Sequence, residues 1–213
     1  MLLDRRVFAL YRAAYPAADR RYINGVSIKP DGSGVATDGS LLVKWTPEFP
    51  VDPKEYPHID GINPVSDEPL TPFTLDLEVC KTLERALRKK TTMPILSYAA
   101  VDVTQTNANN FVFMAVTDLE SQQLVKPRKV NQTDEKGNEE DAFPKYDRVI
   151  PTNDPTVTIT FGLDVLKRLI DTLQALDLKS AKFEFRDAES PAVVTGEGEA
   201  GKVFALAMPI RTT

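Results

Sequence analysis

The chain has 213 residues, of which 42% are hydrophobic and 27% charged, and a formal net charge of −5, as expected for a globular protein of one large or two small domains. No apolar run approaches the roughly 18 residues needed to span a bilayer, and nothing near residue 1 is typical of a signal peptide, so we expect a cytoplasmic protein without membrane partners. A single cysteine and a single histidine exclude an internal disulfide and a Cys/His zinc site.

The first 50 residues predict one unit built from a helix and short strands. Apolar residues at helical spacing indicate an amphipathic helix over residues 2–14, with a basic outer side. Pro16 is expected to end this helix. Strand-like runs are expected at residues 22–28 and 41–45, with tight turns at residues 30–34 and 37–40. The unit is therefore expected to be a helix followed by at least three short antiparallel strands.

A proline-rich connector, residues 51–72, leads into a second unit over residues 73–130. The second unit is expected to contain a strand, a helix and two further strands, at residues 73–77, roughly 78–90, 95–103 and 111–116. Cys80 falls within this helix and is expected to be a buried structural residue rather than a reactive thiol. The two units together predict one domain over residues 1–130.

Two prolines bracket residues 143–151, Phe-Pro-Lys-Tyr-Asp-Arg-Val-Ile-Pro, and favour an extended connector over a helix or a central strand. We call residues 143–151 the strap. Residues 131–141 before it are polar and are expected to form a mobile loop. The loop and the strap, residues 131–151, are thus expected to join two packed bodies. A weaker echo of the strap at residues 56–64 indicates that the chain repeats itself.

Residues 152–213 predict a third unit of the same kind. A strand at residues 156–161 is expected to precede a strongly apolar helix over residues 163–176. Further strands are expected at residues 181–185, 192–195 and 203–210. The chain then consists of three units of strand, helix and strands, of which the first lacks its leading strand. Each helix would cover one sheet, and each sheet would need its neighbour to cover an edge.

No group of residues predicts catalysis or metal binding. Asp38 and Asp118 each follow a threonine at the end of an apolar strand, where an aspartate oxygen usually caps the N–H groups of a turn. A pair of catalytic carboxylates is the less favoured interpretation. The acidic residues 134–141 lack the spacing of metal ligands, and His58 alone does not support a Ser/His/Asp site. We expect neither an enzyme nor a bound cofactor or metal.

Basic residues cluster in two short segments of a protein that is acidic overall. They lie on or near the first two predicted helices and are Arg5, Arg12, Arg20, Arg21, Lys81, Arg85, Arg88, Lys89 and Lys90. Attraction to phosphate does not depend on base sequence, so such faces suit a protein that slides along duplex DNA. The alternative is an ordinary solvated helix face, which the mixed charges of Lys167 and Asp171 favour for the third helix.

Short motifs spread along the chain resemble the bacterial sliding clamp, the β subunit of DNA polymerase III. Besides the strap they are Arg21-Tyr22-Ile23-Asn24-Gly25-Val26, Ala36-Thr37-Asp38-Gly39, Met93-Pro94-Ile95-Leu96-Ser97, Ala115-Val116-Thr117-Asp118-Leu119-Glu120 and Met208-Pro209-Ile210-Arg211. The resemblance implies an α+β DNA clamp fold, with repeated strand-helix-strands units and helices on one face of antiparallel sheets. It also implies a toroid whose helices line a hole around duplex DNA, without catalytic residues.

The same resemblance implies a pocket that binds partner peptides. The positions that match it are Thr37, Gly39, Ser40, Leu41, Leu42, Pro144, Arg148, Val149, Met208, Pro209, Ile210 and Arg211. Residues 208–210 could otherwise be a simple edge strand, where proline is tolerated. The chain departs from the family where Ser40-Leu41 replaces the usual His-Arg and where Thr212-Thr213 replaces a final Leu.

We therefore expect a polymerase processivity factor: a homo-oligomer that encircles or rides duplex DNA non-specifically and tethers a DNA polymerase or other replication or repair proteins. The alternative is a non-encircling adaptor of the same fold that binds only proteins. The number of units is a further departure, because the family clamp has three domains of two units each. Either residues 46–72 hide a degenerate fourth unit, or the chain assembles differently.

Overall fold

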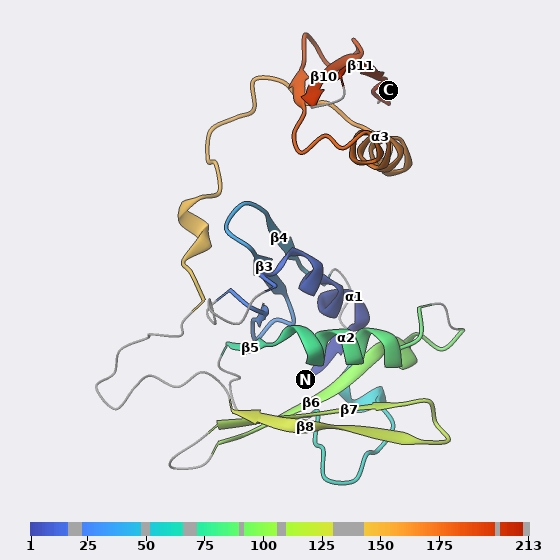
Figure 1. Ribbon diagram of the computed structural model, residues 1–213. Helices are drawn as coiled ribbons and strands as arrows, with labels where there is room; N and C mark the ends of the chain where they lie inside the picture. The colour runs from blue at the N-terminus through green and yellow to red at the C-terminus, as the bar shows by residue number, and fades with distance from the viewer. Residues whose placement is uncertain are drawn as a thin grey trace. The chain divides into compact units, whose positions relative to one another are not determined.

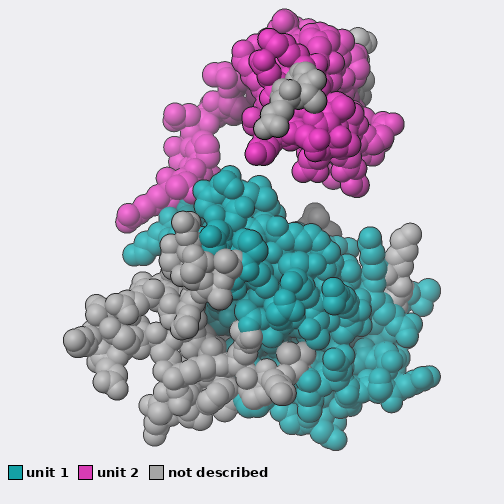
Figure 2. Space-filling view, in the orientation of Figure 1, with its two compact units in different colours: residues 1–146 teal, residues 147–213 magenta. Residues whose placement is uncertain are grey.

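The chain divides into two units, Met1–Tyr146 and Asp147–Thr213, coloured teal and magenta in Figure 2. The computed structural model describes residues 1–16, 23–47, 52–65, 72–89, 92–105, 110–129, 143–198 and 201–210. Within the strap, Tyr146–Arg148 form a short 3₁₀ turn, η4. The boundary between the units therefore falls inside the strap.

Unit 1 contains two four-stranded antiparallel sheets (Figure 1). The first has the order β1-β6-β7-β8, formed by Leu2–Asp4, Tyr98–Gln105, Asn110–Thr117 and Gln122–Lys129. The second has the order β4-β3-β2-β5, formed by Leu42–Trp45, Gly34–Thr37, Val26–Ile28 and Phe73–Leu75. The helices are α1 (Arg5–Phe8), which continues as the 3₁₀ helix η1 (Ala9–Ala13), and α2 (Leu77–Ala86). The expected combination of helices with antiparallel sheets is confirmed.

The two halves of unit 1, β1 to β4 and β5 to β8, exchange their leading strands. Strand β1 precedes α1 in the chain but pairs with β6 of the other half, with Leu3 opposite Ala99. Strand β5 precedes α2 but pairs with β2 of the other half, with Thr74 opposite Ser27. Each sheet is thus completed by a strand that belongs to the other half of the unit.

One hydrophobic core joins these halves. Phe8 of α1, Leu83 of α2 and Met114 of β7 are buried in the same cluster. Cys80 lies in this cluster too, as expected, and burial raises the pKa of its thiol to about 12. Because both helices contribute to a single core, the burial that stabilises one half depends on the presence of the other.

Each helix of unit 1 begins at an aspartate. The carboxylate of Asp4 accepts a hydrogen bond from the backbone N–H of Arg6 at 2.7 Å, and that of Asp76 accepts one from Val79 at 2.9 Å. Both residues are N-caps at the end of a leading strand: Asp4 is the last residue of β1, and Asp76 directly follows β5. The caps set where each helix starts and therefore which of its residues face the core.

Two turns of unit 1 share one geometry, which confirms the turn interpretation of Asp38 and Asp118. Asp38 Oδ1 accepts from the N–H groups of Ser40 and Leu41 at 2.8 and 2.7 Å, and Asp118 Oδ1 accepts from those of Glu120 and Ser121 at 3.1 and 2.7 Å. These backbone hydrogen bonds hold the pKa of both carboxyls below the usual range. Both aspartates are therefore structural caps.

The described part of the proline-rich connector, residues 52–65, packs against a sheet. It contains a 3₁₀ turn, η2 (Pro53–Glu55), and an isolated bridge between Ile59 and Ile62. These two isoleucines cluster with Ala100 and Ala115 of β6 and β7. Residues 52–65 hold no helix-and-sheet unit, so the described connector contains no degenerate fourth unit.

Unit 2 contains one helix, α3 (Leu163–Ala175), and one antiparallel sheet in the described part of its chain. The sheet has the order β11-β10-β9, formed by Gly201–Ala207, Ala192–Gly198 and Lys182–Glu184. Its buried apolar residues are Leu173, Leu178, Ala192, Val194 and Ala207. A Cβ on Gly196 would lie 2.1 Å from a methyl of Leu178, so glycine lets this buried leucine pack directly against the backbone of β10.

Several expected elements differ from the structure. Residues 2–14 do not form one helix, because Leu2–Asp4 find a strand partner in β6 and the helix starts at Arg5. Residues 156–161 form no strand, since their segment receives one sheet-like hydrogen bond, from Ile210 N–H to the Thr160 oxygen at 2.7 Å. The leading strand is therefore missing from the predicted repeat at residues 152–213 and not from the predicted repeat at residues 1–50.

Two boundaries and one strand also differ. The second helix, expected to reach about residue 90, ends at Ala86, which is exposed. The strand expected from residue 95 begins at Tyr98, because residues 94–97 form a 3₁₀ helix, η3 (Pro94–Ser97). Strand β8 is not expected from its sequence, which is polar and contains a proline. It lies at the edge of its sheet, where polar residues and proline are tolerated. The expected loop at residues 131–141 lies outside the described residues.

Candidate nucleic-acid interface

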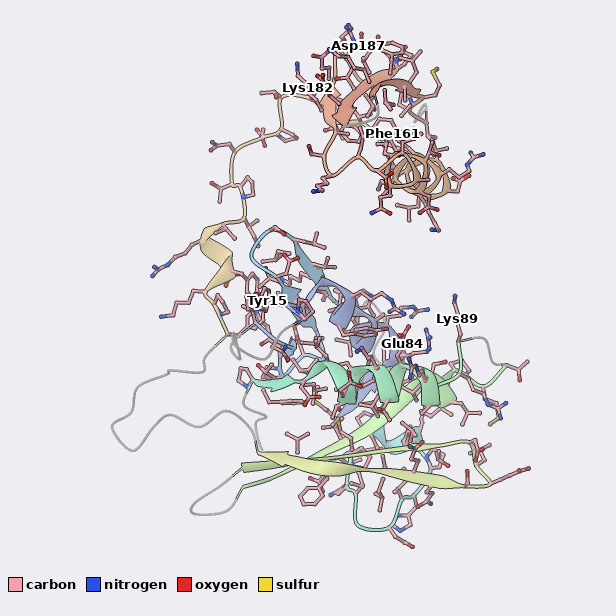
Figure 3. All side chains as sticks on the ribbon, viewed as in Figure 1. Tyr15, Glu84, Lys89, Phe161, Lys182 and Asp187 are labelled. Atoms are coloured by element: carbon pink, nitrogen blue, oxygen red, sulfur yellow. The ribbon has the colours of Figure 1, made fainter. Side chains whose placement is uncertain are left out.

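Exposed basic residues gather at the C-terminal end of α2. Arg85 lies in the last turn of the helix, Arg88 and Lys89 follow it, and all three are exposed. Cations are favoured at this end because the last helical carbonyls carry partial negative charge. Lys89 extends away from the helix in Figure 3. Within the described part of the chain none of the three forms an ion pair, so their charges are available to an external anion.

The ring of Tyr11 brings together cations from both helices. The Arg12 guanidinium lies 4.7 Å from the ring centroid, and the Lys81 ammonium lies 5.8 Å from it. Each cation also has a carboxylate partner: Arg12 contacts Glu84 at 2.9 Å, and Lys81 contacts Glu78 at 2.7 Å. The hydrogen bond to Glu84 raises the pKa of Arg12, and the bond from Lys81 lowers the pKa of Glu78. Each cation therefore has part of its charge offset by a neighbouring carboxylate.

Arg5 is fixed by the fold rather than presented to solvent. Its Nη2 contacts Glu84 Oε1 at 3.1 Å, and its Nε donates to the backbone oxygens of Glu84 and Leu87 at 3.0 and 3.2 Å. The side chain is 20% exposed, against 57% for Arg12. Figure 3 labels Glu84, which accepts bonds from both arginines. Arg5 thus donates hydrogen bonds to backbone carbonyl groups at the C-terminal end of α2.

Arg6 is an exposed cation that the sequence pattern does not select. Its side chain is 72% exposed and pairs with Asp4 at 3.0 Å. The pattern selects Arg5 because it assumes a helix that begins near residue 2. The cap at Asp4 shifts the start of the helix to Arg5, whose side chain is held at α2 while that of Arg6 is exposed. An aspartate after two leucines is the sequence signal that could have revealed this shift.

The structure thus brings Arg12 and Lys81 together over Tyr11 and places Arg85, Arg88 and Lys89 at the end of the same helix as Lys81. The other three predicted DNA-binding residues, Arg20, Arg21 and Lys90, lie outside the described residues. Helix α3 differs, since Lys167 pairs with Asp171 at 2.9 Å and Arg168 lies 3.9 Å from Asp164. Its formal charges cancel, which agrees with the solvated-face interpretation of that helix.

The predicted peptide pocket draws residues from both units. In unit 1, Thr37 is buried and accepts the N–H of Gly39, Ser40 and Leu41 are exposed, Leu42 is half-buried and Pro144 is exposed. In unit 2, Arg148, Val149, Met208 and Ile210 are exposed and Pro209 is half-buried, while Arg211 lies outside the described residues. Each set is solvent-accessible apart from Thr37. Their convergence into one pocket stays a prediction.

Two further classes of site are absent from the described residues. No three His, Cys, Asp or Glu side chains lie together in a way that could hold a metal ion. No helix there has the length and apolar character required to cross a membrane.

Unit 2 has a recess of about 520 Å³ beside the β10–β11 hairpin, lined by residues that include Lys182, Glu197 and Lys202. Lys182 and Lys202 are paired with Glu184 and Glu197, so the recess has no evident ligand specificity.

No model of a known protein family matches the chain, and no curated protein matches its sequence. Among solved structures, it is similar to the DNA polymerase III subunit beta from Pseudomonas aeruginosa, with a TM-score of 0.37 and 14% sequence identity. The match covers 100% of this chain and 66% of that chain.

Proposed function

We propose that this protein is a sliding-clamp-like processivity factor that binds duplex DNA without sequence preference through α1, η1 and α2 of unit 1. The observation that carries the proposal is a group of cations on adjacent helices of a protein whose net charge is −5. The group consists of Arg12, Lys81, Arg85, Arg88 and Lys89. The motifs that resemble the sliding clamp, and the repeated order of strand, helix and three strands in unit 1, support it.

The charges on this face suit phosphate better than bases. Glu78 and Glu84 offset part of the charge of Lys81 and Arg12, so the three cations at the end of α2 are expected to contribute most of the affinity. Lysine and arginine at a helix surface attract the phosphate backbone, which looks alike at every base pair. A protein held in this way can move along DNA without a preferred site.

The proposed function includes partners. We infer a cytoplasmic homo-oligomer that closes around the duplex and tethers a DNA polymerase or another replication or repair protein through the predicted pocket. The exposed Leu41 of unit 1 and Met208 of unit 2 are the apolar anchors that would contact a partner peptide. The chain itself is proposed to have no catalytic role.

A charge-matched pair of variants tests the DNA face. Replacing Arg85, Arg88 and Lys89 with Ala should weaken duplex binding and reduce the slope of log K against log salt by up to about 3, because each lost phosphate contact contributes about 0.9. Replacing Lys167, Arg168 and Lys179 with Ala removes the same charge from unit 2. That control should bind DNA like the parent. Equal losses in both variants would mean that only net charge matters, and would overturn the assignment of this face.

A topological measurement separates the clamp from the adaptor. A protein closed around a nicked circular plasmid should stay bound at a salt concentration that releases it from the same plasmid after linearisation, because it can slide off only at free ends. Failure of the parent to bind any duplex at low salt, while it is oligomeric, would overturn the DNA function and leave the protein-binding adaptor.

A further inference from the structure

The start of unit 2 resembles the start of the second half of unit 1 in sequence, but unit 2 has no partner half within the described residues. Residues 73–87 read FTLDLEVCKTLERAL and residues 159–173 read ITFGLDVLKRLIDTL. The two helices begin at the equivalent residues Leu77 and Leu163, directly after the caps Asp76 and Gly162. In the aligned sequences, residues 159–161 therefore correspond to β5, and α3 corresponds to α2.

The strand pairing of unit 1 shows what this half is missing. There, the first strand after each helix, β2 or β6, is paired along both edges, and one of its neighbours is the leading strand of the other half. In unit 2 the first strand after the helix, β9, pairs only with β10 among the described residues. Residues 159–161, which match a leading strand, belong to no sheet there, although the Thr160 oxygen accepts a hydrogen bond from the N–H of Ile210 in the same chain. Within the part of the chain that the structure describes, unit 2 thus has both an open strand edge and a leading segment that belongs to no sheet.

The helices of unit 1 meet at one equivalent position. Arg12 and Glu84 are each the eighth residue after their caps, Asp4 and Asp76, and they contact each other at 2.9 Å. The eighth residue after Gly162 is Ile170, which is 48% exposed. The place where one helix meets its counterpart therefore carries an ion pair in unit 1 and an exposed apolar side chain in unit 2. An isoleucine suits contact with a second isoleucine better than contact with a charge.

Unit 2 also exposes aromatic residues near β9, whereas the leading strand β5 of unit 1 is buried. Phe73 and Leu75 of β5 are 3% and 1% exposed. In unit 2, Phe161 and Phe183 each lie with their ring centroids 6.3 Å from that of Phe185, and Phe183 and Phe185 are 39% and 48% exposed. Figure 3 labels Phe161 next to α3. The cluster lies beside the open edge of the sheet, since Phe183 is in β9.

The surface is large enough for a second copy once strands are exchanged. A large apolar side chain has roughly 150–250 Å² of surface. With the exposed fractions of its residues, the apolar surface of unit 2 then amounts to on the order of 400 Å², contributed by Leu163, Ile170, Phe183 and Phe185. A standard interface buries about 800 Å² per partner, and exchanged strands would supply much of the remainder. The charges of α3, Asp164, Lys167, Arg168 and Asp171, cancel, so a second α3 meets no net repulsion.

We propose that two copies of the chain pair through unit 2, each laying its residues 159–161 along β9 of the other while the two α3 helices meet at Ile170. The result is a domain of the same plan as unit 1, assembled from two chains by a two-fold axis. The three-residue ladders of β1 with β6 and β5 with β2 are its template. This pairing specifies one interface of the proposed oligomer, but it depends on unit 2 alone and does not require DNA binding.

Symmetric cross-linking of the full chain tests the pairing. In the variant Ile170→Cys, two copies should form a reducible dimer in high yield on mild oxidation, because the same residue lies on both sides of the axis. Arg168→Cys places a thiol on the opposite side of α3 and should give little dimer. The parent is a clean background, since burial suppresses the reactivity of Cys80, its only thiol. Equal yields from both variants would overturn the proposed axis.

Charge complementation supplies an independent test by mass in solution. Ile170→Glu and Ile170→Arg should each raise the dissociation constant of the dimer at least tenfold, since like charges then face each other. An equimolar mixture should restore pairing, because it recreates the Arg12–Glu84 contact of unit 1 between chains. Circular dichroism should stay that of the parent, as Ile170 is exposed in one chain. A parent that is monomeric at all concentrations, or an oligomer indifferent to both variants, would overturn the proposal. Neither measurement contains DNA, so its outcome is separate from that of the DNA experiments.

Discussion

Arg5 and Glu84 connect the two halves of unit 1, with Arg5 Nη2 3.1 Å from Glu84 Oε1 and Arg5 Nε 3.0 Å from the backbone oxygen of the same residue. The glutamate side chain is 9% exposed. One contact therefore both neutralises a largely buried carboxylate and satisfies a carbonyl at the end of α2. A residue that a helical pattern assigns to solvent is part of the structural framework.

Replacing Glu84 with Ala should lower the free energy of unfolding of unit 1 by about 2–3 kcal/mol, because Arg5 loses its carboxylate partner while it remains mostly buried. The expected loss is at the lower end for a buried pair because the second partner, Arg12, is more than half exposed. Urea denaturation followed by the fluorescence of Trp45, in β4 of unit 1, measures it. The control Glu78→Ala breaks the exposed pair with Lys81 and should change stability by less than about 1 kcal/mol. Equal effects would contradict the framework role of Glu84.

Replacing Leu119 with Gly should stabilise unit 1 by about 1 kcal/mol, since Leu119 has a φ of 79° and a left-handed backbone costs an L-residue roughly that much. Its side chain is exposed, so little burial is lost. Gly39 occupies the equivalent turn with a φ of 95°, and Gly39→Ala should destabilise by a similar amount. Thermal unfolding of both variants checks the pair, and a destabilised Leu119→Gly would contradict the shared turn geometry.

Acid should weaken these turns. The pKa of Asp118 is lowered in the folded chain, chiefly by the backbone hydrogen bond from Ser121, so the folded pKa lies below the unfolded value of about 4. Its stabilising contribution is then present above that unfolded value and is lost as the pH falls through the folded pKa. Asp118→Ala should therefore have a lower urea midpoint than the parent at pH 7 and nearly the same midpoint near pH 2.5. A difference that persists in acid would show that the carboxylate charge is not the cause.

Replacing Met208 with Asp should leave the melting temperature nearly unchanged, because the methionine is 59% exposed. If residues 208–210 form part of the predicted pocket, the same change should abolish binding of a short peptide that carries leucine and phenylalanine anchors and a free carboxylate, measured by fluorescence anisotropy. Lys202→Asp, an exposed charge change in the same strand region, is the control and should bind the peptide normally. A large drop in melting temperature would identify Met208 as a core residue and remove it from the pocket.

Local patterns predicted what local interactions determine. The apolar helix at residues 163–176, the burial of Cys80 and the capped turns at Asp38 and Asp118 follow from spacing and turn chemistry within a few residues, and the structure confirms them. Leading strands are different. Leu2 and Leu3 are a strand because Ala100 and Ala99 lie opposite them, and residues 159–161 are none, since no such partner is present among the described residues.

The candidate interface likewise contains residues whose exposure local patterns predict and residues whose positions depend on tertiary pairing. The exposure of Arg85, Arg88 and Lys89 follows from their place at the end of one amphipathic helix. The positions of Arg5 and Arg6 depend on the cap that ends β1, a strand that only tertiary pairing reveals. The attraction of Arg12 and Lys81 to one tyrosine ring likewise requires both helices to be in place.

The exchange of leading strands also governs when the chain can fold. Strand β1 is made first, yet its partner β6 begins at Tyr98, so the N-terminal segment leaves the ribosome long before its ladder can form. Pairings between residues so far apart in the chain close slowly, and until they close the edges of β2 and β6 are open to other chains. Translation that stalls before β6 would therefore leave a nascent chain prone to aggregation. When the whole chain refolds, the earliest protection from hydrogen exchange should appear in both halves of unit 1 at once.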